Sequence, residues 1–156
     1  MTDSGLVVAI DAIITALESG ALSGVTHATQ RYFPALAFTD KQGPCLEVHP
    51  STTPRTALAT NGLGEWNYRL LIGWWVMDPE SLGRGKVTQD SGKAVLNVCE
   101  AIARQVGTWY TTGLPGDSDT TIYDVEVLEI RYGRTPRGGA IGVEIHINLR
   151  RILDGT

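Results

Sequence analysis

The stretch WNYRLLIGWWV, residues 66–76, decides the fold. In a β-strand, successive side chains point to opposite faces of the sheet, so adjacent Trp74 and Trp75 place one indole on each side. One face is continuously apolar or aromatic, with Trp66, Tyr68, Leu70, Ile72, Trp74 and Val76. The other begins polar and ends apolar, with Asn67, Arg69, Leu71, Gly73, Trp75 and Met77. The chain's own core can bury the first face, whereas the second needs another element of the chain or a partner.

Length and composition indicate an ordinary globular protein. With 156 residues, 42% of them hydrophobic and 19% charged, we expect one domain spanning residues 1–156. The net charge of −4 and the lack of a long basic run argue against specific nucleic-acid binding. No apolar run is long enough for a membrane span, and the N-terminus lacks the basic region of a signal peptide. Cys45 and Cys99 are expected to be buried free thiols, as in a cytoplasmic protein.

Hydrophobic periodicity predicts two main helices, at residues 5–19 and 87–106. Gly107 is the expected terminator of the second helix. Strands are predicted at residues 25–33, 44–49, 66–76, 122–131 and 141–149. A connection rich in Ser, Thr, Pro and Gly covers residues 51–64, and connections of this length are usually functional or disordered.

The last two strands are expected to form an antiparallel hairpin with a long tip at residues 133–139. The apolar residues of the first of them switch parity near Val127 and Leu128, which predicts a β-bulge. Because strands outnumber helices and hairpins dominate, the sequence predicts an α+β fold. Its sheet should be mostly antiparallel, of about five strands, with the two main helices packed on it.

No residue constellation indicates catalysis. His27, His49 and His146 have no second ligand at metal-binding spacing, and His146 suggests at most an exposed polar ladder with Glu144 and Asn148. Arg84 and Lys86 precede the second helix in a glycine-flanked loop, but the phosphate-loop pattern is absent. We therefore predict no catalytic residues, cofactor or metal, and interpret this loop as a mobile basic segment.

The remaining unusual feature is apolar and aromatic content with no evident cover. Leu71, Trp75 and Met77 lie on the second face of the central strand, and Trp109 and Tyr110 follow the predicted second helix. Either the first helix covers the second face, giving a sheet between two helices, or these residues form a protein–protein interface, where Trp, Tyr, Met and Arg are enriched.

The chain resembles the tail terminator, or tail-completion, proteins of the neck of long-tailed bacteriophages. The resemblance spans nearly the whole chain and is carried by element order, length and texture. It includes the helix LVVAIDAIITAL, the strand PCLEVHP, the strand WNYRLLIGWWVMDP, the helix VTQDSGKAVLNVCEAIARQV and the final strand IGVEIHINLRRI.

The resemblance implies a structural virion protein with an α+β sandwich fold and no active site. Such proteins form a ring, usually of six copies, on the head-proximal end of the tail tube. The ring ends tube polymerisation and presents a surface to the head-side connector, and DNA can pass through it. The implied partners are further copies of the chain, the tail-tube protein and the connector protein, and the implied location is the virion, after assembly in the host cytoplasm.

A ring closed by rotation needs two different complementary patches on each subunit. We expect the basic loop with Arg84 and Lys86 to form one of these patches, and the acidic residues Glu126 and Glu129 to form the other. The 51–64 connection and the hairpin tip, with Arg134 and Arg137, are expected to be docking elements. Two alternatives stay open: another head–tail connector or tail-tube component, and a small enzyme using a cleft near His146 and Glu144.

Overall fold

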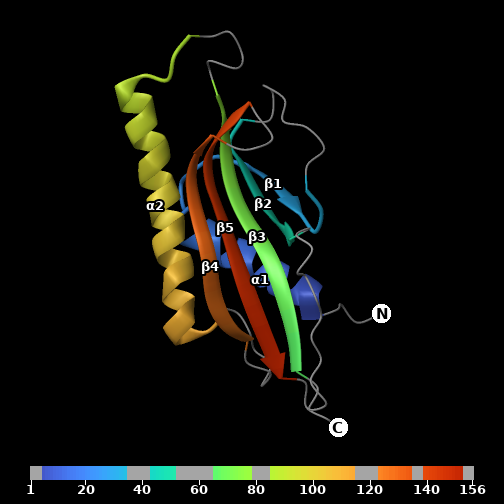
Figure 1. Cartoon of the computed structure of the whole chain (residues 1–156). Helices are drawn as coiled ribbons and strands as arrows, with labels where there is room; N and C mark the ends of the chain where they lie inside the picture. Colours follow the sequence, from blue (N-terminus) through green and yellow to red (C-terminus); the bar gives the residue numbers. More distant parts are fainter. Residues whose placement is uncertain are drawn as a thin grey trace.

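The computed structural model describes residues 5–34, 43–51, 65–78, 85–114, 123–134 and 139–152 (Figure 1). The elements follow the predicted order of helix, two strands, strand, helix and hairpin. They are α1 (Gly5–Ser19), β1 (Ala28–Arg31), β2 (Cys45–Pro50), β3 (Glu65–Met77), α2 (Gln89–Thr112), β4 (Tyr123–Arg134) and β5 (Ala140–Ile152). No helix within these ranges has the length and apolarity required to cross a membrane.

The five strands form one sheet in the order β1-β2-β3-β5-β4. β1 pairs with β2 in parallel, and the other three pairings are antiparallel. The predicted α+β fold with a mostly antiparallel sheet is therefore confirmed. The predicted bulge is confirmed as well, because the β4–β5 register shifts between Val127 and Glu129.

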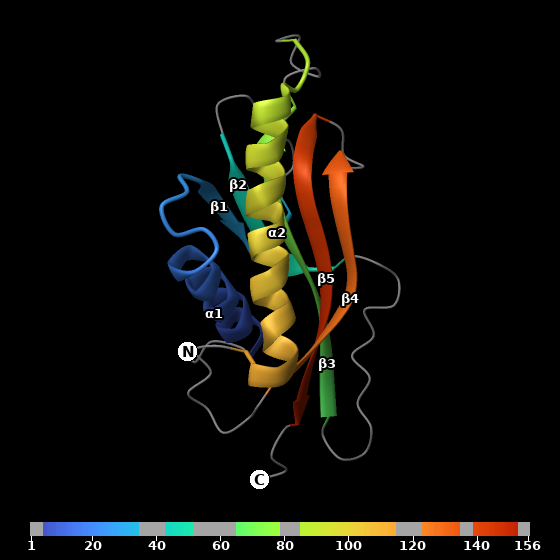
Figure 2. The same cartoon turned by 90° about the vertical axis from the view of Figure 1, so that its left-hand side faces the viewer.

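Both helices pack on the same face of the sheet (Figures 1 and 2). This is the face of Leu70, Ile72 and Trp74, whose side chains share one core cluster with Ile13 of α1 and Ile102 of α2. α1 lies by β2, and α2 lies over β4 and β5. The possibility that α1 covers the opposite face is thus wrong, because α1 and α2 occupy the same layer.

The side chain of Gln105 ties the two helices together. Its Nε2 donates to the carbonyl of Ala16 at 2.8 Å, and its Oε1 accepts from the backbone N–H of Ala21 at 2.7 Å. A β-carbon at Gly20 would lie only 2.5 Å from that Oε1, so the glycine leaves the space that Gln105 occupies. The amide thereby binds two backbone groups where α1 ends and the regular helical hydrogen bonds stop.

α2 is longer than predicted. It begins after Thr88, whose hydroxyl accepts from the N–H of Ser91, and it ends at Thr112 before Gly113, whose φ of 77° suits glycine. Gly107, the predicted terminator, lies inside the helix. Two further turns carry Trp109 into the core. Burial of that side chain contributes more than the roughly 1 kcal/mol that an interior glycine costs a helix.

Candidate functional site

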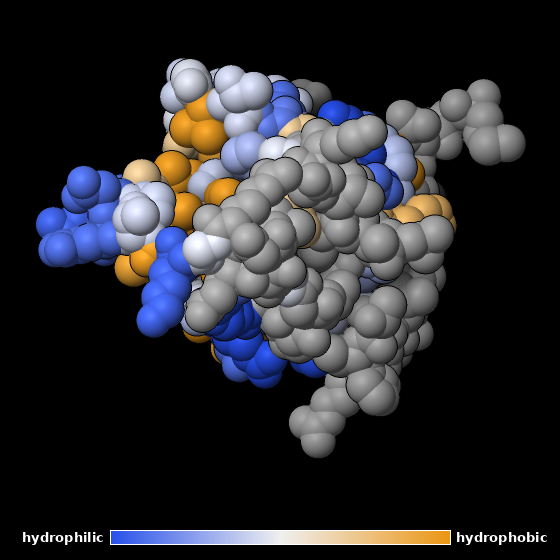
Figure 3. Space-filling model, turned by 90° about the horizontal axis from the view of Figure 1, so that it is seen from above, coloured by the Kyte–Doolittle hydropathy of each residue, from blue (hydrophilic) through white to orange (hydrophobic). Residues whose placement is uncertain are grey.

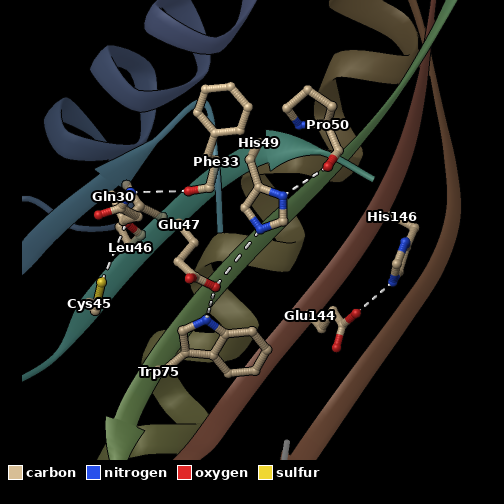
Figure 4. Close-up of polar contacts among 10 residues, drawn as sticks. All are labelled: Gln30, Phe33, Cys45, Leu46, Glu47, His49, Pro50, Trp75, Glu144 and His146. Atoms are coloured by element: carbon tan, nitrogen blue, oxygen red, sulfur yellow. Dashed lines mark hydrogen bonds and ion pairs between the residues drawn. The ribbon is translucent and has the colours of Figure 1, made fainter. Parts of the chain in front are cut away.

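The second face of β3, opposite the helices, holds a buried polar cluster around Trp75. Trp75 is as buried as Trp74, with 3% of the surface of each residue exposed. Its indole lies over Gly73, where a β-carbon would come within 2.6 Å of the ring atom Cζ2. Its Nε1–H donates to Oε2 of Glu47 at 2.8 Å, and Glu47 is the cross-strand partner of Gly73 on β2 (Figure 4). The missing side chain at Gly73 is thus what lets the indole reach Glu47.

His49 adjoins this pair on the same face of β2 (Figure 4). Its Nδ1 lies 2.9 Å from the carbonyl of Pro50, which can only accept, so Nδ1 carries a proton. Its Nε2 is buried with no hydrogen-bond partner among the described residues, and it lies 4.0 Å from Oε2 of Glu47, beyond hydrogen-bonding distance.

A second pair repeats this pattern on β5, where Nε2 of His146 lies 2.8 Å from Oε1 of Glu144. Glu144, like Glu47, is in register with Gly73, and His146, like His49, is in register with Leu71. The sheet therefore carries two matched Glu-x-His pairs on either side of β3. The sequence signal for them is the repeat of Glu-Val-His at 47–49 and Glu-Ile-His at 144–146, inside two alternating strands.

The two pairs do not converge on a common site. They lie two strands apart, which is about 9–10 Å, and the buried Leu71 stands between the histidines. Within the described ranges no group of three or more His, Cys, Asp or Glu side chains could hold a metal ion. The geometry supports a structural role for the pairs in the sheet.

Three of the predicted interface residues are instead buried in the isolated chain. Leu71 and Trp75 belong to the cluster on the second face, and Trp109 belongs to the core beneath α2. The prediction that Trp109 follows the helix is wrong, because it lies in the last turns of α2. Met77, at the end of β3, is partly exposed.

Four of the seven large exposed apolar residues in the described ranges lie at the β4 edge of the sheet, beside α2. They are Leu96 on α2 and Leu128, Ile130 and Tyr132 on β4, and we refer to these four as the α2–β4 strip. β4 is the last strand of the sheet, so one side of its backbone is unpaired within the described part of the chain. An exposed apolar strip beside an unpaired strand edge is typical of an interaction surface.

Tyr132, on β4, lies beside the flank of α2 that carries Glu100 and Arg104. Burial raises the pKa of Tyr132, the negative charge of Glu100 raises it further, and the nearby positive charge of Arg104 opposes the shift. Leu96 lies one helical turn before Glu100 and therefore on the same flank of α2. In Figure 3, hydrophilic side chains project farthest on the side where α2 lies, with hydrophobic side chains close behind them.

The structure brings two predicted interface residues, Tyr110 and Glu126, together at the α2–β4 edge. Both line an open groove of about 490 Å³, together with Val125, Asn148 and the half-exposed ion pair of Asp124 and Arg150. Sequence periodicity alone could not predict this groove, because it forms where the last turn of α2 meets the start of β4 (Figure 2).

Of the predicted charged residues, some lie outside the described ranges and others form ion pairs within the chain. Lys86 is exposed before α2, and Arg84 and Arg137 lie outside the described residues, as do residues 52–64. Glu129 accepts from Nε of Arg131 at 2.6 Å, and this hydrogen bond lowers the pKa of Glu129. Arg134 forms an ion pair with the buried carboxylate of Asp78 in its own chain.

Comparison with known proteins identifies no family for this chain. No family model and no curated protein matches the sequence.

Proposed function

We propose that this chain is a structural subunit of the neck of a long-tailed bacteriophage. It forms a homo-oligomeric ring, with six copies as the working number, that caps the head-proximal end of the tail tube. The ring ends tube polymerisation and joins the tube to the head-side connector, with the DNA path through its centre.

The observation that carries this proposal is the α2–β4 strip. Four of the seven large exposed hydrophobic residues in the described ranges belong to this strip, and a fifth, Tyr110, lies near the end of α2. Such concentration on one edge is unusual for a surface that meets only water, and apolar and aromatic side chains are enriched in the cores of subunit interfaces.

The fold supports the same function. The order of two helices and five strands, and the helices packed on one face of a mostly antiparallel sheet, agree with the sandwich that the resemblance to tail terminators implies. On the second face, Glu144 and His146 pair with each other at 2.8 Å.

The first test measures the mass of the purified protein by size-exclusion chromatography with light scattering, together with negative-stain electron microscopy. We expect a ring of several copies, and we expect Leu96→Glu or Tyr132→Glu to reduce the mass to that of a monomer. Ala101→Glu is the matched control, because Ala101 is exposed on the same helix about 140° around its axis from Leu96.

The second test asks whether the protein binds tube ends. Tail tubes assembled from the tube protein of the same phage should carry the ring at one end and stop growing when it is added. A folded protein that stays monomeric and leaves tube growth unchanged would contradict the proposal. Binding along the whole tube, or incorporation into it, would instead favour a tube component.

A further inference from the structure

Two large exposed apolar residues in the described ranges lie outside α2 and β4, at the other edge of the sheet. They are Phe33, which follows β1, and Val8 on α1. β1 and β4 are the two outermost strands of the sheet, so Phe33 and the α2–β4 strip lie on opposite sides of one subunit (Figure 2). They cannot contact each other within one chain, but a head-to-tail arrangement of copies brings each next to the other.

Phe33 projects from a backbone that its own neighbours hold in place. Tyr32 has a φ of 74°, a backbone angle that residues other than glycine rarely adopt. Its N–H donates to the carbonyl of Val48 at 2.9 Å. The Tyr32 hydroxyl donates to Oδ1 of Asp11 at 2.8 Å, and Nε2 of Gln30 donates to the carbonyl of Phe33 at 3.1 Å.

These contacts end β1 and present the phenyl ring outward. Figure 4 shows the ring of Phe33 directed away from Glu47 and Trp75. Phe33 is 74% exposed, although its backbone is held by these hydrogen bonds. An aromatic side chain held in this way loses little conformational freedom when a partner covers it, which favours binding.

The strip offers an apolar and aromatic surface for this ring. Aromatic rings pack well against one another and against branched aliphatic side chains, and Tyr132 and Ile130 provide both. Each surface also carries an exposed ion pair, Arg31 with Asp11 beside Phe33 and Arg104 with Glu100 beside Tyr132. Exposed pairs of this kind are weak enough to exchange partners, so Arg31 of one copy can pair with Glu100 of the next.

We propose that Phe33 of one copy packs into the α2–β4 strip of the next copy, and that this repeated contact closes the ring. The proposal rests on the ring assembly of the proposed function and identifies its contact. The contact is heterologous, so each subunit contributes Phe33 on one side and the strip on the other. It differs from the charge pairing expected between the Lys86 and Glu126 regions.

The decisive experiment mixes two variants that each lack one half of the contact. Phe33→Glu and Tyr132→Glu alone should each be folded monomers by circular dichroism and light scattering. Their equimolar mixture should form a 1:1 dimer, because one intact contact remains between Phe33 of one variant and the strip of the other. The dimer cannot grow, since its two outer edges are both altered.

Milder variants give the magnitude of the effect. Phe33→Ala should weaken subunit association by about 30-fold or more, equivalent to about 2 kcal/mol, as expected for a buried aromatic anchor. Thr26→Ala, an exposed position shortly before β1, is the matched control and should leave the ring mass unchanged.

Several outcomes would overturn this contact. They are a Phe33→Glu protein that still forms rings, a variant mixture that stays monomeric, and a wild-type chain that stays monomeric. Rings that persist in Phe33→Glu and still cap tubes would refute the contact and leave the proposed function intact. A wild-type protein that neither assembles nor binds tubes would refute both.

Discussion

The contribution of the Trp75–Glu47 hydrogen bond to stability can be measured by comparing Trp75 with Trp74, its neighbour in β3. The two indoles are equally buried, on opposite faces of β3. Nε1 of Trp75 donates to the buried carboxylate of Glu47, whereas Nε1 of Trp74 is buried and has no hydrogen-bond partner in the described part of the chain. Replacing each with Phe removes similar apolar area, but only Trp75→Phe removes a hydrogen bond.

The expected difference follows from that contrast. A hydrogen bond to a charged group contributes about 1.5–3 kcal/mol, so Trp75→Phe should reduce the free energy of unfolding by that much more than Trp74→Phe. For a chain of this size the difference corresponds to roughly 3–12 °C in Tm. Urea denaturation followed by far-ultraviolet circular dichroism measures both variants without depending on tryptophan emission.

A double-mutant cycle assigns the effect to the named pair. Trp75→Phe and Glu47→Gln should be non-additive, with a coupling energy of at least about 1 kcal/mol, because both changes affect the same hydrogen bond. Equal stabilities for Trp74→Phe and Trp75→Phe, or additive effects of Trp75→Phe and Glu47→Gln, would refute the role given to this contact.

Three further predictions test other parts of the fold. Gly107→Ala should raise the free energy of unfolding by about 0.5–1 kcal/mol, because Gly107 lies inside α2 with open space around it. A loss of stability would mean that the helix ends at Gly107. Gly142→Ala should lower the free energy of unfolding by more than about 3 kcal/mol or prevent folding, because a β-carbon there would collide with the backbone carbonyl of Trp74. An unchanged urea midpoint would exclude that close approach. Burial raises the pKa of the Cys99 thiol to about 11, so Cys99 should react with a thiol reagent at pH 8 only after unfolding, and rapid modification of the native Cys45→Ala protein would contradict this.

The elements of this protein could be predicted from its sequence because each depends on local periodicity. The bounds of α1 match the prediction, and the bulge in β4 follows from the parity switch after Val127. The second helix was predicted too short because Gly107 resembles a terminator when only its neighbours in sequence are considered. The stabilising contact of Trp109 with the core is long-range.

The interface residues were harder to predict for the same reason. Trp75 and Leu71 are apolar residues on the face without helices, and the sequence alone indicates either a core or a partner. Their burial, and the hydrogen bond from Trp75 to Glu47, depend on the pairing of β2 with β3. Ile130 and Tyr132 follow the alternation of core residues, yet they are exposed because β4 is the edge strand.

The sequence by itself determined the α+β class, the order of the elements and the two faces of residues 66–76, because side-chain direction repeats every two residues in a strand. Only the tertiary structure decided that α1 and α2 share one face, that Trp75 is covered, and that Phe33 and the α2–β4 strip lie at opposite edges. These features depend on which strands are neighbours in the sheet, and strand order is set by packing between segments far apart in the chain. Local periodicity states which side chains share a face but not what lies against that face.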